Sequence, residues 1–64
     1  MVISNHTQRG GIKQALGTIG FLDRQIRQFP NAANLADMIA RKANAERQLS
    51  ALRSATVYVD PRFP

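Results

Sequence analysis

Apolar residues recur at separations of three and four positions through the first half of the chain. This spacing places them along one side of an α-helix, so we expect a helix over about residues 8–29. The stripe consists of Ile12, Ala15, Ile19, Leu22, Ile26 and Phe29, with Leu16 on its flank. The helix start has two alternatives, a cap formed by Asn5 with Gln8 or a first turn after the Gly10-Gly11 pair. Pro30 disfavours helical backbone at the residue before it and therefore sets the end.

A second apolar stripe predicts another helix over about residues 32–55. The stripe consists of Leu35, Met38, Ile39, Ala45, Leu49 and Leu52. Asn31 or Asn34 can cap this helix, and the charge of Asp37 suits its positive N-terminal end. Lys42 interrupts the stripe, where a polar residue sets the register of packing or extends its charged end to water. Because the connection around Pro30 is short, we expect the two helices to be antiparallel neighbours with facing stripes.

Both ends of the chain have extended character. Residues 1–4 and 56–59 are short and rich in β-branched side chains, and we expect them to leave the same end of the hairpin in opposite directions. They can pair within one subunit or between two. Residues 60–64, which include Pro61 and Pro64, are expected to form an extended tail. The predicted fold is therefore all-α: a single domain, residues 1–64, formed by an antiparallel two-helix hairpin with short extended N- and C-terminal segments.

The chain of 64 residues is small for an independent fold. A domain of this size buries roughly 60% of the surface that its unfolded chain exposes, so its stability is marginal. The chain has no cysteine for a disulfide, and its one histidine, His6, and four acidic residues are scattered. We therefore expect no metal site, no cofactor and no catalytic group, and hence no enzyme. Homodimerisation or assembly with other chains is the expected way to complete the fold.

One side of the first predicted helix combines basic residues with glycines. Opposite the apolar stripe lie Gly10, Lys13, Gly17, Gly20, Arg24 and Arg27, again separated by three or four positions. A glycine inside a helix costs about 1 kcal/mol relative to alanine, a cost that a function should offset. We interpret Gly17 and Gly20 as a groove for the backbone of a partner, another protein or a second copy, with Phe21 as its aromatic anchor. The alternative is that the helix tolerates both glycines.

Two further aromatic residues, Tyr58 and Phe63, fall outside both apolar stripes. Exposed aromatic side chains in a small protein often mark a contact surface, so we count both among the predicted partner-binding residues. In the alternative interpretation, Phe21 packs under the terminal segments and Tyr58 lies over the helix ends.

Nine basic residues against four acidic ones give a formal charge of +5, which favours acidic partners. Part of this charge is expected on solvated surface, because Asp37 with Arg41 and Lys42 with Glu46 are spaced to form ion pairs along a helix. The leading hypothesis is a small non-catalytic protein-interaction module, an inhibitor, adaptor or minor assembly component, that acts by docking and occlusion. The first alternative is a basic nucleic-acid-binding regulator. A membrane-surface helix is the least favoured class.

Location is constrained by two patterns that the sequence lacks. No apolar run has the length of a membrane span, and the N-terminus lacks the regions of a signal peptide. We therefore expect a cytoplasmic protein. Small chains without cysteine are common among phage products, so association with a virion is a further hypothesis.

Overall fold

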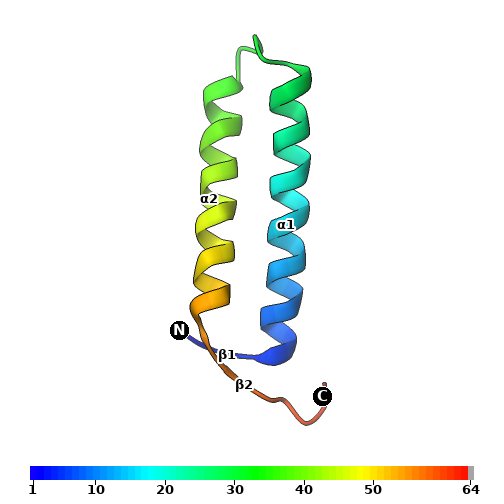
Figure 1. Ribbon diagram of the computed structural model, residues 1–64, viewed down its shortest axis with the longest axis vertical. Helices are drawn as coiled ribbons and strands as arrows, with labels where there is room; N and C mark the ends of the chain where they lie inside the picture. The colour runs from blue at the N-terminus through cyan, green and yellow to red at the C-terminus, as the bar shows by residue number, and fades with distance from the viewer. Residues whose placement is uncertain (64) are drawn as a thin grey trace.

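The computed structural model describes residues 1–63 and confirms the helical hairpin. In chain order it contains β1 (Val2–Ser4), α1 (Asn5–Gln28), α2 (Leu35–Ser54) and β2 (Thr56–Tyr58). The two helices lie antiparallel and packed against each other, and the two short strands lie together at the open end of the hairpin (Figure 1). The Cα trace measures 48 × 18 × 11 Å, so the molecule is a single layer of two helices.

Helix α1 begins at Asn5, three residues before the expected start near residue 8. Its N-cap is Ser4, whose Oγ accepts a hydrogen bond of 3.1 Å from the backbone N–H of Thr7 and donates one of 2.9 Å to Thr7 Oγ1. Asn5 and Gln8 do not form the expected capping pair. Instead, Gln8 Nε2 donates to the backbone carbonyl of Leu52 at 2.9 Å, which joins the first turns of α1 to the last turn of α2.

The turn between the helices is longer than expected. Helix α1 ends at Gln28, and the N–H of Phe29 bonds to Gln25 O at 2.9 Å. Successive turns through residues 29–34 follow, so α2 begins at Leu35 and not near residue 32. Asn34 occupies the N-cap position, but its side chain makes no capping hydrogen bond, because its backbone lies at φ −97° and ψ 20°, outside the usual extended cap conformation.

The apolar seam between the helices is narrow. The residues buried at its centre are Ala15, Leu22, Met38 and Ala45. Three residues assigned to the stripes or their flank, Leu16, Phe29 and Ile39, are exposed instead. Leu16 and Ile39 lie on the edge of the stripes, where a single neighbouring helix cannot reach them, and Phe29 lies beyond the last helical residue. Among residues 1–63, no large side chain is fully buried.

The two strands pair in parallel, which corrects the expectation that they run in opposite directions. Val2 pairs with Thr56, Ile3 with Val57 and Ser4 with Tyr58. Both strands cross the open end from the α2 side to the α1 side, because β1 must arrive at the start of α1 while β2 leaves the end of α2 (Figure 1). The helical hairpin is thus the crossover connection that a parallel pair requires.

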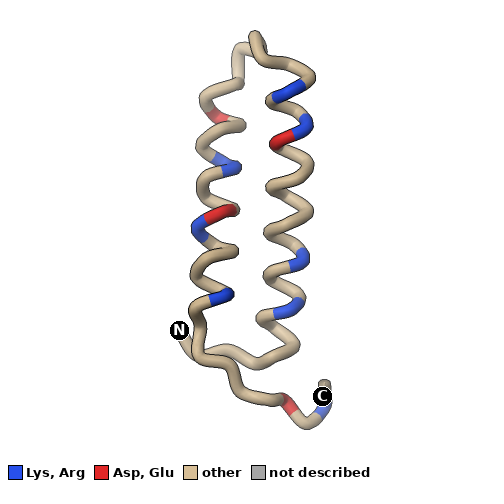
Figure 2. Tube along the Cα trace, viewed as in Figure 1, with Lys and Arg blue, Asp and Glu red and all other residues tan. Residues whose placement is uncertain are grey.

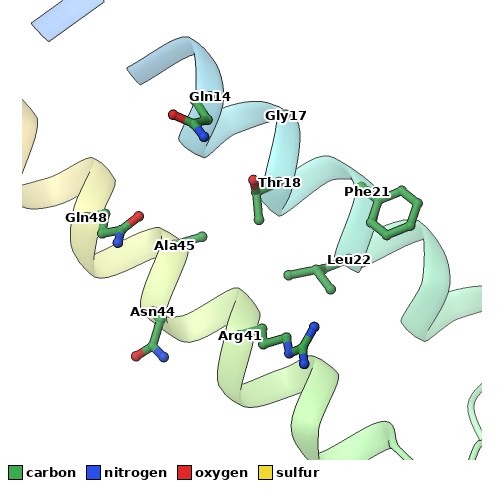
Figure 3. Close-up of a pocket in the computed structure, with 9 residues that line it drawn as sticks. All are labelled: Gln14, Gly17, Thr18, Phe21, Leu22, Arg41, Asn44, Ala45 and Gln48. Carbon is green, nitrogen blue, oxygen red and sulfur yellow. The ribbon is translucent and has the colours of Figure 1, made fainter. Parts of the chain in front are cut away.

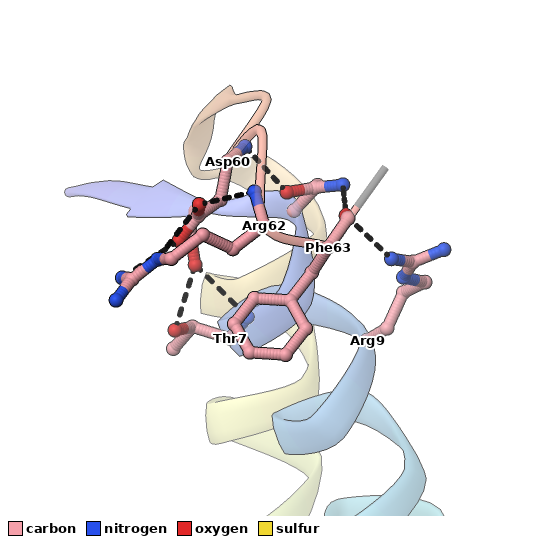
Figure 4. A network of polar contacts seen from close by, with 7 residues as sticks. Thr7, Arg9, Asp60, Arg62 and Phe63 are labelled. Atoms are coloured by element: carbon pink, nitrogen blue, oxygen red, sulfur yellow. Dashed lines mark hydrogen bonds and ion pairs between the residues drawn. The ribbon is translucent and has the colours of Figure 1, made fainter.

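Residues 60–63 turn back onto α1, so the expected extended tail is wrong for this segment. The N–H of Asp60 donates to Asn5 Oδ1 at 2.9 Å, and Asn5 Nδ2 donates to the carbonyl of Phe63 at 2.8 Å (Figure 4). The rings of Phe63 and His6 stack with centroids 3.9 Å apart. The side chain and the backbone N–H of Arg62 donate hydrogen bonds to the Asp60 carboxylate, which stabilise the turn. The same hydrogen bonds lower the pKa of Asp60. Pro64 lies outside the described residues.

One ion pair links the two helices. Lys42 Nζ lies 3.1 Å from Asp23 Oδ1, so Lys42 contacts α1 and not Glu46 as expected, whereas the predicted Asp37–Arg41 pair is confirmed at 2.9 Å. The hydrogen bond from Lys42 lowers the pKa of Asp23 most, and the positive charge of Arg27 adds to this effect. The Asp23–Lys42 pair joins the middle of α2 to the C-terminal half of α1.

Ser4→Ala is expected to lower the free energy of unfolding by about 1 kcal/mol, because it removes the N-cap acceptor of α1. Urea unfolding followed by circular dichroism measures the change. Ser50→Ala, at an exposed position of α2, serves as the control and should not destabilise the protein. Equal stabilities for the two variants would contradict the capping role of Ser4.

Asp23→Asn is expected to be less stable than the natural chain at neutral pH, and the difference should disappear in acid. The folded-state pKa of Asp23 lies below its unfolded value, so its stabilising effect is complete above about pH 4 and is lost as the pH falls through the folded-state pKa. Urea unfolding of both proteins at several pH values tests this. A stability difference that stays constant down to about pH 2 would contradict the role of the Asp23 carboxylate.

Candidate protein-binding groove

A groove of about 630 Å³ runs between the helices on one side of the hairpin. Each wall of the groove is a set of residues separated by three or four positions. The wall on α1 consists of Gln14, Thr18 and Phe21, and the wall on α2 consists of Arg41, Asn44 and Gln48. Each set therefore lies along one side of its helix. The full lining consists of Gln14, Gly17, Thr18, Phe21, Leu22, Arg41, Asn44, Ala45 and Gln48 (Figure 3).

The groove is open and shallow, and two of the residues that line it, Gly17 and Ala45, are small. Ala45 is buried between the helices, and Gly17 contributes no side chain to fill the space. Leu22 points towards α2 and supplies an apolar base, whereas Phe21 points away from α2 at the outer rim (Figure 3). The Phe21 side chain is 60% exposed, so a large aromatic surface stands beside an open apolar hollow.

A second hollow of about 390 Å³ continues the groove towards the open end of the hairpin. The two hollows share Gln14, Thr18 and Gln48. The second also contacts Met1 and Ala51. Side-chain amides donate and accept hydrogen bonds, so the walls offer both kinds of group along an otherwise apolar channel.

The structure divides the predicted partner-binding residues among three places. Gly17 and Phe21 line the groove. Lys13, Gly20, Arg24 and Arg27 lie exposed on α1 outside it, and Arg27 pairs with Asp23 at 3.2 Å. Tyr58 and Phe63 lie at the open end, where Tyr58 is exposed and Phe63 stacks on His6. The groove therefore includes two of the predicted residues, and the others surround it or lie apart from it.

Of the four glycines, Gly11 is the one that packs against the other helix, a contact that sequence reasoning did not single out. A Cβ at Gly11 would lie 2.8 Å from Leu52 Cδ1. At Gly17 and Gly20, by contrast, a Cβ would meet no atom of residues 1–63 within 4 Å beyond the local helix backbone. The spacing of Gly11, Ala15 and Leu22 along one side of the helix was the signal that could have identified this contact.

The polar wall of α2 was also missed, because Arg41 was considered only as an ion-pair partner of Asp37 and not together with Asn44 and Gln48. Arg41 is held by Asp37, and Asn44 Oδ1 accepts a hydrogen bond of 3.2 Å from Arg47 Nη1.

In the part of the chain that the structure describes, no three His, Cys, Asp or Glu residues are grouped as metal ligands. Neither described helix has both the length and the apolar character needed to cross a bilayer.

Comparison of the chain with protein-family models, with curated proteins and with solved structures finds no match. Function must therefore be inferred from the shape and chemistry of the hairpin's own surfaces. Of these, the groove combines a hollow of about 630 Å³ with an exposed aromatic side chain.

Gly17→Ala should raise the free energy of unfolding by about 0.5 to 1 kcal/mol, because alanine stabilises the helix and its methyl group enters open space. Gly11→Ala should gain clearly less or lose stability, because the Leu52 side chain must move to admit the same methyl group. Urea unfolding of the two variants provides the comparison. Equal gains at both positions would contradict the close helix contact at Gly11.

Proposed function

We propose that the protein is a non-catalytic interaction module that docks on an acidic surface of another protein through the groove. The observation that carries this proposal is the 60% exposed Phe21 at the rim of an apolar hollow with a small-residue base. Aromatic side chains beside a pocket commonly supply most of the binding energy of an interface. Docking there would cover the corresponding surface of the partner and act by occlusion.

The shape of the groove suits a helical segment of the partner. Two adjoining hollows along two antiparallel helices form a channel parallel to the helix axes. A third helix placed in this channel would set its apolar side chains over Gly17 and Ala45. Its polar flanks would meet the amides of Gln14, Asn44 and Gln48, so the walls would contribute orientation and the base would contribute apolar contact.

Charge supports an acidic partner. Lys13 and Arg24 lie on the exposed side of α1 next to Gly17, and neither forms an ion pair within residues 1–63. The chain carries a formal charge of +5, which attracts acidic surfaces and speeds association with them. A partner helix with Asp or Glu on one flank would therefore be favoured.

The distribution of basic residues gives less support to nucleic-acid binding. Lys and Arg occur along both helices and in the tail without gathering in one place (Figure 2). Four of the nine, Arg27, Arg41, Lys42 and Arg62, form ion pairs with acidic residues of the same chain. Binding to nucleic acid depends on several phosphate contacts made together, which a dispersed set supplies poorly.

Gly17→Leu is expected to weaken partner binding at least about tenfold while leaving the helices intact, because Gly17 lines the groove and a Cβ at this position meets open space. The test is affinity capture from an extract of the native host with quantitative mass spectrometry, followed by calorimetric titration of the purified captured protein. Gly10→Leu is the matched control, since Gly10 is equally open and does not line the groove.

Capture of an acidic protein by the natural chain and by Gly10→Leu, with loss in Gly17→Leu, is the expected pattern. Equal capture by Gly17→Leu would exclude the groove as the binding site. A labelled duplex of about 20 base pairs, titrated between roughly 50 and 200 mM salt, distinguishes the alternative. Submicromolar binding with a steep salt dependence would indicate a nucleic-acid-binding function instead.

A further inference from the structure

The side of the hairpin opposite the groove carries a second, aliphatic surface. Each helix contributes one row of residues separated by three or four positions. The row on α1 consists of Ile12, Leu16, Ile19 and Asp23, and the row on α2 consists of Ile39, Lys42, Glu46 and Leu49. The 3.1 Å contact between Asp23 and Lys42 joins the two rows, so both lie on the same side of the molecule. We refer to these two rows as the aliphatic face.

Large apolar side chains in this face are uncovered. Leu16 is 48% exposed and Ile39 is 51% exposed. Ile12, Ile19 and Leu49 are only half-buried, because α1 and α2 contact each other along one edge of these residues. None of the five lines the groove. Branched side chains in such a row are suited to packing against further helices.

The total exposed area indicates how much surface a partner must cover. The chain exposes 4796 Å² for a mass of 7.1 kDa, whereas a compact monomer of that mass exposes about 4,100 Å². The excess of about 700 Å² is close to the roughly 800 Å² that each partner buries in a stable interface of standard size. A second two-helix layer that covers one side of the hairpin would therefore reduce its exposed area to that of a compact protein of the same mass.

The charge of the aliphatic face favours a second copy as that layer. The chain as a whole carries +5, but the charged members of the face, Asp23, Lys42 and Glu46, sum to −1, and Arg27, which pairs with Asp23, brings the local sum to 0. Glu46 is also the one acidic residue among residues 1–63 that forms no ion pair. Two copies can approach here without the repulsion that their other surfaces produce, and Glu46 remains free to pair with a basic residue of the other copy.

We propose that two copies pack through their aliphatic faces to form a four-helix bundle. A two-fold arrangement makes each face its own complement and closes the assembly at two chains. Leu16, Ile19 and Ile39 then enter the bundle core, and the Asp23–Lys42 pair sets its register. The grooves remain on the two outer sides. The dimer does not depend on the proposed binding of a partner in the groove.

Sedimentation equilibrium tests the dimer directly. The natural chain should have about twice its 7.1 kDa mass at tens of micromolar, and Leu16→Glu should weaken association at least about tenfold while retaining helical circular dichroism. Phe21→Glu is the matched control, because it places the same charge on the opposite side of α1, and it should stay dimeric. A monomeric natural chain, an assembly larger than two, or dissociation caused only by Phe21→Glu would overturn the proposal.

Thiol reactivity provides a second test that does not depend on a folded charge variant. The chain has no cysteine, so Leu16→Cys and Phe21→Cys each introduce a single probe. The thiol of Leu16→Cys should react several-fold more slowly as protein concentration rises, whereas that of Phe21→Cys should react at a constant rate. Reaction of both thiols at rates independent of concentration would contradict burial of the aliphatic face in a dimer.

Discussion

Two helices can make only one interface, and this constraint determines which apolar side chains of α1 and α2 are buried and which stay exposed. The centre of that interface is occupied by small or slender residues, with Ala15 of α1 and Ala45 of α2 both buried. The remaining apolar residues fall on either side of it, where no third element covers them. The groove with Phe21 and the aliphatic face with Leu16 are the two open sides that result.

The open end of the hairpin is closed by contacts between the two ends of the chain. The parallel strands pair there, Gln8 bonds to the carbonyl of Leu52, and Asn5 holds the turn at Asp60 through both of its side-chain groups. These contacts prevent the helices from separating at the end far from the connecting turn. They also fix the position of the groove, whose second hollow reaches Met1.

Periodicity in the sequence was sufficient to predict the helices and their antiparallel packing, because the spacing of Ile12, Ile19 and Leu22 has no other regular interpretation. It could not predict the parallel strands, since their direction depends on how each segment crosses the end of the hairpin. The turn at Asp60 depends on contacts with Asn5, more than fifty residues away in sequence. Lys42 likewise had two acidic residues within reach, and only the packing of the helices selects Asp23.

The groove was predicted only in part, because it too depends on contacts between residues far apart in the sequence. Gly17 and Phe21 were identified from one helix alone, whereas the wall formed by Asn44 and Gln48 becomes apparent only when the second helix is placed beside the first. Conversely, the sequence places Gly11 on the side of Ala15 and Leu22, but only the position of Leu52 shows that this glycine is packed while Gly10, Gly17 and Gly20 are open. A surface formed by two helices can be predicted only when the position of one helix relative to the other is known.

In the proposed dimer, a second copy of the chain stabilises this single layer of two helices. The dependence of the thermal unfolding midpoint on protein concentration tests this claim most directly, because ligands that bind only the folded state raise its stability by mass action. We expect the midpoint to rise steadily as the concentration increases about 100-fold. A midpoint that is independent of concentration over that range would contradict the account.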